Sequence, residues 1–352
     1  MKTIAFTAID EGTGKTAITV GSGLLAQRRG LDVGYMKPKG TRLESHVGKV
    51  RDRDPLLAAE VFGLEADIAD LEPIVYSPTF VQNAVRGKED PARLAERVTD
   101  AFETLSSDHD LMVIEGAGPL ETGAIVSLTD PDIAELLDAE AVIIAEFDRL
   151  EDLDGIVRAA DMFGDRLLGI IFNRVEDHAA TVLEQDGIPF LEERGYRVLG
   201  VVHHDRELAG VTVEELAEQL GATALTDVGK DAFVDRFLVG AMGAGEAYRH
   251  FRRTRNAAVV TGGDRPEIHT AAIEASGISC LVVTGTTRPP RKILSRAEQN
   301  NLAVLMLNTD TLTAVERAEE VVRGGRVQDP ETVESMAEHL KRQVDVDRLL
   351  SR

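Results

Sequence analysis

The chain has 352 residues, with 61 acidic against 39 basic side chains and a formal net charge of −22. Its length favours two domains over one, and its 43% hydrophobic content is that of a soluble globular protein. The negative field excludes nucleic acid and anionic membrane surfaces as partners, and it is typical of proteins adapted to high salt. No apolar run reaches membrane length, so we expect a cytoplasmic protein. The single cysteine, Cys280, lies in a strand-like apolar run and is expected to be a buried core thiol.

Short apolar runs alternate with amphipathic stretches along the first two thirds of the chain. This rhythm predicts an α/β fold with a mostly parallel sheet and helices on both faces. The predicted strands are Thr3–Ala8, Asp32–Met36, Leu111–Ile114, Ala141–Glu146, Leu168–Phe172 and Val198–Val202. The clearest predicted helices are Thr16–Arg29, Leu56–Phe62 and Asp90–Ser106, the last beginning with Asp-Pro-Ala as cap and first turn.

The pattern restarts in the second part of the chain. Strands are predicted at Ala257–Thr261, Cys280–Thr284 and Ala303–Leu307, with helices at Glu267–Ser276, Lys292–Asn300 and Thr311–Gly324 and a last helix capped by Asp329. We therefore expect two domains: residues 1–226 form a parallel-sheet nucleotide-binding domain, and residues 227–352 form a smaller α/β domain with a C-terminal helix.

A glycine-rich segment, Gly12-Thr13-Gly14-Lys15-Thr16, joins the first predicted strand to the first predicted helix. In this context glycines let backbone N–H groups converge on phosphate oxygens at the helix N-terminus. Lys15 would neutralise the terminal phosphates, and the Thr16 hydroxyl would bind Mg²⁺. The segment departs from the usual motif, because Ile9 stands where its first glycine is expected. The alternative interpretation is an ordinary strand–helix turn that contains a lysine.

Other charged residues lie at predicted strand ends or begin a helix. Glu115 opens the sequence Glu-Gly-Ala-Gly directly after a strand, and Lys37 ends another strand before a proline. The carboxyl ends of parallel strands are where open α/β sheets bind ligands, and a carboxylate there suits a metal-bound triphosphate. Asp52 and Asp54 precede a helix, and for Asp52 a helix-capping role is the favoured interpretation.

Thr16, Lys37, Asp54 and Glu115, in this order and at these intervals, resemble the motifs of dethiobiotin synthetase over roughly residues 1–225. The resemblance implies that ATP and Mg²⁺ are cofactors, and that Thr16, Asp54 and Glu115 ligate the metal. It implies that Lys15 and Lys37 are catalytic, holding the transferring phosphate and the acid group that it attacks. It also implies that Asn173 reads the adenine base; the alternative is an amide that caps its own turn. The loop residues expected to bind nucleotide are Gly12, Thr13, Gly14, Lys15 and Thr16.

Residues 227–325 resemble the domain named for the sequence Asp-Arg-Thr-Gly-Gly (DRTGG). The matching turn is Gly262-Gly263-Asp264-Arg265, followed here by Pro266 where threonine often stands. A dethiobiotin-synthetase-like domain followed by a DRTGG domain resembles the N-terminal, regulatory region of long phosphotransacetylases. Because the chain ends at Arg352, we expect it to lack acetyl-transfer activity. Asp264 and Arg265 are a candidate effector site; the alternative is an ion pair that pins the turn.

Three functions follow as hypotheses. The first is an ATP- and Mg²⁺-binding regulatory protein with weak or no turnover, which responds to a small-molecule effector or to a partner enzyme of acyl metabolism. The second is an ATP-dependent ligase that phosphorylates a carboxylate or carbamate. The third is a nucleotide-dependent scaffold, and a homo-oligomer is expected.

Overall fold

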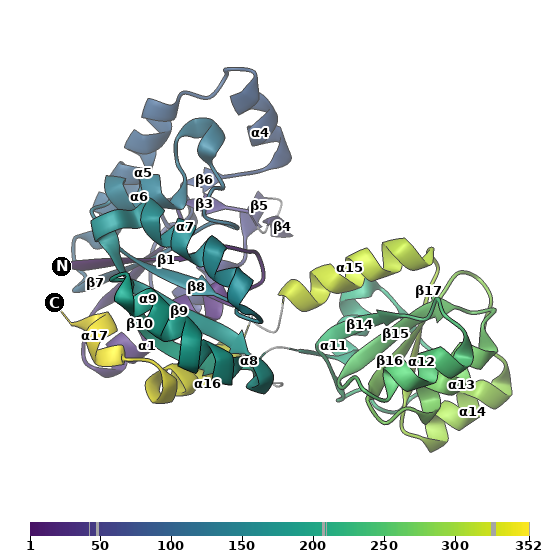
Figure 1. Ribbon diagram of the computed structural model, residues 1–352. Helices are drawn as coiled ribbons and strands as arrows, with labels where there is room; N and C mark the ends of the chain where they lie inside the picture. Colours follow the sequence, from purple (N-terminus) through teal and green to yellow (C-terminus); the bar gives the residue numbers. More distant parts are fainter. Residues whose placement is uncertain (42, 47–48, 206–207, 209, 325–328, 352) are drawn as a thin grey trace. The chain divides into compact units, whose positions relative to one another are not determined.

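The computed structural model describes residues 1–41, 43–46, 49–205, 208, 210–324 and 329–351 of the chain (Figure 1). The chain divides into two compact units. The first is Met1–His204 together with Val327–Arg352, and the second is Asp205–Arg326. Both are α/β units with parallel strands, which confirms the predicted fold class.

The first unit is built on a six-stranded sheet in the order β10-β9-β8-β1-β7-β2. Every neighbouring pair in this sheet is parallel. Apart from its first residue, each of the central strands β1 and β8 is fully buried, as expected when helices cover both faces. The strands are β1 (Lys2–Ala8), β2 (Val33–Met36), β7 (Leu111–Glu115), β8 (Glu140–Ala145), β9 (Leu167–Val175) and β10 (Val198–His203). All six predicted strands are thus confirmed.

Helices α1 (Lys15–Arg28) and α16 (Pro330–Gln343) cover one face of this sheet, and α6 (Asp130–Leu136) and α7 (Leu153–Phe163) cover the other (Figure 1). Asp90 caps helix α5 (Pro91–Ser106) by accepting the Ala92 N–H, as predicted from the sequence. The remaining helices of this unit are α2 (Asp54–Phe62), α3 (Ile68–Leu71), α4 (Pro78–Val85), α5 (Pro91–Ser106), α8 (Asp177–Val182), α9 (Ile188–Glu193) and α17 (Val346–Leu350). Two short pairs complete it: β3 (Lys39–Gly40) with β6 (Ile74–Val75), and β4 (Leu43–His46) with β5 (Lys49–Asp52).

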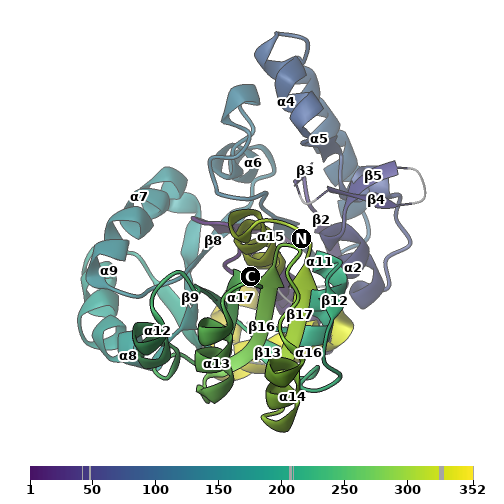
Figure 2. The same ribbon diagram turned by 90° about the vertical axis from the view of Figure 1, so that its right-hand side faces the viewer.

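The second unit has a five-stranded sheet in the order β12-β17-β16-β15-β14. Strand β12 is antiparallel to β17, and the other neighbouring pairs are parallel. Its strands are β12 (Thr223–Ala224), β14 (Arg236–Val239), β15 (Ala257–Gly262), β16 (Ile278–Thr284) and β17 (Ala303–Leu307), with β11 (Val211–Thr212) pairing β13 (Phe233–Val234). One core lies under α12 (Ala244–Phe251), α13 (Pro266–Glu274) and α14 (Arg291–Gln299), and the other under α11 (Val213–Leu220) and α15 (Thr311–Gly324) (Figure 2).

The division differs from the expected boundary at residue 226 in two respects. Residues 205–226 belong to the second unit, where α11 packs into its core. The C-terminal segment joins the first unit, because α16 packs on α1 and the Asp345 N–H donates to the Leu199 carbonyl of β10 at 2.7 Å. Helix α1 is buried almost all round, so it needs a second apolar partner besides the sheet.

Among the described residues, no helix combines the length and apolar character needed to cross a membrane. The thiol of Cys280 is fully buried, as predicted, and burial raises its pKa.

Candidate functional site

The loop that joins β1 to α1 is built around two glycines in the left-handed region. Gly12 has φ +76° and Gly14 has φ +82°, a conformation that glycine adopts at little cost and other residues avoid. Helix α1 begins at Lys15, directly after Gly14. The loop therefore surrounds the N-terminus of a 14-residue helix, whose unpaired N–H groups and dipole favour a bound anion.

One side chain of this loop is buried without a partner. Thr13 is 2% exposed, and its hydroxyl oxygen makes no hydrogen bond to any residue in the described ranges. Buried polar atoms in folded proteins are nearly always satisfied. A phosphate oxygen is a group that would satisfy this hydroxyl, so Thr13 fits the predicted ligand.

Lys15 reaches from the loop to the segment that follows β7. Its Nζ donates to the carbonyl oxygen of Gly118 at 2.7 Å. Burial lowers the pKa of Lys15, and the charges of Asp130 and Glu115 act in the opposite direction. A phosphate group bound in the loop would compete with the Gly118 carbonyl for this ammonium.

Lys37, which follows β2, lies among three buried carboxylates. Its Nζ pairs with Asp54 Oδ2, lies 2.8 Å from Asp52 Oδ2 and lies 3.8 Å from Glu115 Oε1. Burial by itself lowers the pKa of Lys37, but the carboxylates outweigh it and the net effect raises the pKa. The lysine therefore stays charged.

Glu115, the last residue of β7, accepts a hydrogen bond on each carboxylate oxygen. Thr16 Oγ1 donates to Oε1 at 2.6 Å, and the Tyr35 hydroxyl donates to Oε2 at 2.8 Å. Burial and the nearby charge of Asp54 raise the pKa of Glu115 to about 7. A carboxyl group that titrates near neutrality binds a cation only after it loses its proton.

The structure brings together the three residues predicted to ligate a metal. Thr16 bonds Glu115, and Lys37 contacts both Glu115 and Asp54. Their oxygens are the hard donors that Mg²⁺ prefers, so the donor chemistry fits this ion, which would compete with Lys37 for the carboxylates. Across the described ranges, no three His, Cys, Asp or Glu side chains are already arranged to hold a metal.

Asp52 has two functions at once. Its Oδ1 accepts the backbone N–H of Asp54, the first residue of α2, at 3.0 Å, so it satisfies a backbone donor at the start of this helix, although the N-cap position itself is Arg53. Its Oδ2 accepts the N–H of Thr41 at 2.9 Å and pairs with Lys37. Asp52 therefore also positions Lys37, a role that the capping interpretation alone did not include.

Asn173, near the carboxyl end of β9, faces the loop Gly12–Thr16 between β1 and α1, called the phosphate loop below. Its Nδ2 donates to the carbonyl oxygen of Thr13 at 2.7 Å. This bond joins Asn173 to the loop that follows β1 and not to its own turn.

Two buried residues that the sequence did not single out support the segment after β7. Lys39 Nζ donates to the Thr122 carbonyl at 2.6 Å and lies 3.2 Å from Asp130 Oδ1. Asp130 in turn accepts the Thr7 hydroxyl at 2.6 Å. This buried pair ties the segment that holds Lys15 to strand β1.

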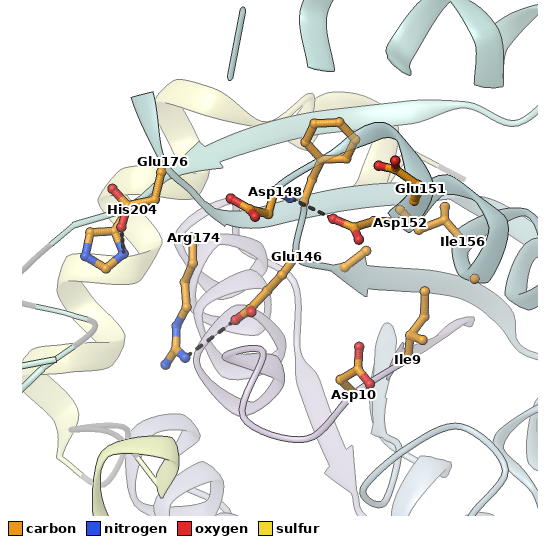
Figure 3. A pocket seen from close by; sticks show the side chains of 13 residues that line it. Ile9, Asp10, Glu146, Asp148, Glu151, Asp152, Ile156, Arg174, Glu176 and His204 are labelled. Atoms are coloured by element: carbon orange, nitrogen blue, oxygen red, sulfur yellow. Dashed lines mark hydrogen bonds and ion pairs between the residues drawn. The ribbon is translucent and has the colours of Figure 1, made fainter. Parts of the chain in front are cut away.

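A pocket of about 590 Å³ lies beside the phosphate loop at the carboxyl ends of β8 and β9 (Figure 3). Arg174 and Glu146 form an ion pair in it, with 3.6 Å between Nη1 and Oε1. Arg174 has φ +57° although it is not glycine, a strained conformation often found at functional sites. The acidic residues that line the pocket are Asp10, Glu146, Asp148, Glu151, Asp152 and Glu176. The sequence could have indicated these two residues, because Glu146 and Arg174 lie where predicted strands end.

In the second unit, Arg265 is bonded to the backbone of a neighbouring loop. Its Nη1 donates to the Gly240 carbonyl at 2.6 Å and its Nη2 to the Met242 carbonyl at 2.9 Å. Its ion-pair partner is Glu267, at 3.4 Å, whereas Asp264 is exposed. Arg265 therefore fixes the turn after β15 through carbonyl groups, which differs from the Asp264–Arg265 ion pair considered as the alternative to an effector site.

Comparisons with known proteins agree with both units. Residues 2–212 match the AAA domain family, and residues 215–321 match the DRTGG domain. The phosphate acetyltransferase of Pseudomonas putida is 26% identical over 366 aligned residues, which cover 98% of this chain and 51% of the relative. The cobyric acid synthase of a Marinomonas species is 30% identical over 231 residues (56% of this chain, 45% of the relative).

The ATP-dependent dethiobiotin synthetase of Methanococcus vannielii is 24% identical over 208 residues, which cover 58% of this chain and 94% of the relative. The chain spans about half the length of the phosphate acetyltransferases that it matches. The phosphate loop, the strand order and these matches lead to one assignment: the chain belongs to the AAA domain family of P-loop proteins, carries a DRTGG domain after it, and is similar throughout to the N-terminal half of phosphate acetyltransferases.

Proposed function

We propose that this chain binds ATP with Mg²⁺ in the loop after β1, and that nucleotide binding serves regulation in the manner of a phosphotransacetylase N-terminal region. The observation that carries the proposal is the joint geometry of the loop. A left-handed Gly14 precedes α1, and the Thr13 hydroxyl is buried without a partner among the described residues. Lys15 is held by a carbonyl contact that a phosphate can replace.

The residues around the loop have separable roles in this proposal. Lys15 binds the terminal phosphates, and Lys37 is held by Asp52 and Asp54 where it can contact a transferring group. Thr16, Asp54 and Glu115 would hold Mg²⁺, which supplies charge neutralisation to the phosphates when bound. Tyr35 keeps the Glu115 carboxylate oriented through the hydrogen bond to Oε2.

The test is calorimetric titration of ATP, with and without Mg²⁺, into wild type and Lys15→Ala. Removing one charge-assisted contact to phosphate should weaken ATP binding by about 10- to 100-fold. Lys88→Ala, an exposed lysine of the same unit, is the matched control and should bind as wild type does. Equal ATP affinity in wild type and Lys15→Ala would refute the proposal.

A second candidate is an ATP-dependent ligase acting on a carboxylate or carbamate. It is favoured by the ordered Lys37 beside Glu115 and by the pocket next to the loop, which could hold a second ligand. ADP release should then be stimulated by a member of a panel of diamines and dicarboxylates and abolished in Lys37→Met. No stimulation by any member leaves binding and regulation as the function.

The regulatory part of the proposal places effector binding at the DRTGG turn. Arg265 fixes the turn through the Gly240 and Met242 carbonyls, so the exposed Asp264 carboxylate is held at a defined place after β15. Asp264→Ala should abolish any shift in melting temperature that acyl metabolites of central metabolism produce in wild type. A shift that persists in this variant would place the effector elsewhere.

A further inference from the structure

The side chain of Asn173 is buried against the phosphate loop. Asn173 is 2% exposed, and its Nδ2 lies 2.7 Å from the Thr13 carbonyl oxygen across a sequence separation of 160 residues. A carbonyl oxygen can only accept, so the amide atom that faces it must be the nitrogen. The amide therefore has one orientation that satisfies this contact.

The same amide fills the space in front of Gly14. A Cβ atom on Gly14 would lie 2.5 Å from Asn173 Nδ2, closer than two such atoms can approach. Gly14 is required by its φ of +82°, and a side chain there would also have to displace the Asn173 amide. The hydrogen bond holds Thr13, and the same amide occupies the space in front of Gly14.

We propose that Asn173 is a positioning residue of the phosphate loop: it fixes the left-handed turn at Thr13 and Gly14, and so supports binding of the phosphate chain whatever the base. This inference rests on the proposed nucleotide binding, and it gives Asn173 a role different from reading adenine. An asparagine amide has two N–H donors and one acceptor, and one of these donors is committed to the loop, so the contact with the loop exists whichever base is bound.

The first experiment compares three ligands by calorimetry in the presence of Mg²⁺: ATP, GTP and inorganic tripolyphosphate. Loss of one buried hydrogen bond that orders the loop should weaken all three in Asn173→Ala by the same factor, about tenfold. The matched control is Asn300→Ala, whose amide also donates to a backbone carbonyl, at 2.8 Å, but at an exposed helix end of the second unit. It should leave all three affinities unchanged.

Two results would overturn the inference. One is a loss confined to ATP with tripolyphosphate binding intact, which is the signature of a base reader. The other is unchanged binding of all three ligands by a folded Asn173→Ala. If wild type binds none of them, the proposed function fails, and that outcome is distinct from either of these.

The second experiment needs no ligand. A double-mutant cycle combines Gly14→Ala with Asn173→Ala and follows the melting temperature by circular dichroism. Because removing the amide frees the space that the added methyl group needs, Gly14→Ala should destabilise the protein less in the Asn173→Ala background. Additive shifts would contradict the contact. If Asn173→Ala does not fold, Asn173→Ser, which is too short to reach Thr13, replaces it in both experiments.

Discussion

The surroundings of Glu115 fix the orientation of its carboxyl group and raise its pKa. Both of its oxygens are already occupied, by the hydroxyls of Thr16 and Tyr35. Burial and the Asp54 charge together raise its pKa from 4.5 to about 7, although Lys37 opposes the shift. A metal ion would add positive charge and favour the ionised form, so cation binding at Glu115 should release a proton near neutral pH.

We expect the raised pKa of Glu115 to appear in the pH dependence of stability without Mg²⁺. The folded protein holds this proton up to pH about 7, whereas the unfolded chain loses it near pH 4.5. Between these values the native state binds more protons, so the stability contribution is present below pH 4.5 and is lost as the pH rises toward 7. Urea unfolding at pH 5 and pH 7.5 should show wild type losing on the order of 1–3 kcal/mol relative to Glu115→Gln.

Glu121→Gln is the control for this measurement, because Glu121 is an exposed carboxylate on the segment after the same strand. It should follow wild type at both pH values. If Glu115→Gln also follows wild type, Glu115 is ionised throughout this range and the electrostatic description of the site is wrong.

At the scale of elements, local patterns predicted most of the first unit. All six strands of its sheet coincide with short apolar runs that end at polar or charged residues, and α5 begins at its Asp-Pro signal. The proximity of Thr16, Asp54 and Glu115, the residues proposed to hold Mg²⁺, follows from their places at strand or helix ends at one edge of the sheet. The buried contact between Lys39 and Asp130 could not be predicted, because the two residues lie 91 positions apart in the sequence and neither is part of a motif.

The packing partner of α16 could not be predicted from the sequence either. Its amphipathic pattern predicts a helix with one apolar face, but that pattern does not say which surface the face covers. The structure packs it on α1, where a Cβ on Gly21 would lie 3.2 Å from Leu340 Cδ1. The long-range pairing of residue 344 with residue 200 fixes the segment on the first unit.

Leu340→Ala tests this packing. Leu340 is fully buried, so its truncation should cost about 2–5 kcal/mol and lower the melting temperature of the first unit only. Differential scanning calorimetry of the full chain, followed through two transitions, is the measurement. Lys341→Ala, its exposed neighbour, should change stability by no more than about 0.5 kcal/mol. A shift in the transition of the second unit would mean that α16 belongs there, as the expected boundary had it.

At the scale of the whole molecule, the negative charge is unevenly shared between the two units. Residues 205–326 carry 17 acidic and 15 basic side chains, while the rest of the chain carries 44 acidic and 24 basic ones. Almost all of the net charge of −22 therefore belongs to the unit with the phosphate loop. Lys15 and Lys37 bring positive charge to the site that would bind a triphosphate, although three carboxylates surround Lys37.

This asymmetry makes adaptation to high salt testable within one molecule. Raising KCl from 0.1 to 1 M shortens the screening length from about 10 to about 3 Å, which removes repulsion among the exposed carboxylates of the folded state. The melting temperature of the first unit should therefore rise by several degrees, while the nearly neutral second unit should change much less. Leu281→Ala, a truncation at a fully buried position of the second unit, identifies the calorimetric transition of that unit in both experiments.

Sucrose at matched osmolality is the control, because an excluded neutral solute stabilises folded proteins without screening charge. It should raise both transitions together, whereas KCl should separate them. If KCl also raises both transitions by equal amounts, the salt acts through general exclusion or hydration, and the acidic surface of the first unit has no screening-dependent role in its stability. If KCl lowers the first transition, attractive ion pairs such as Arg28–Glu334 and Lys2–Glu140 outweigh the repulsion, and the carboxylates stabilise this unit at low salt.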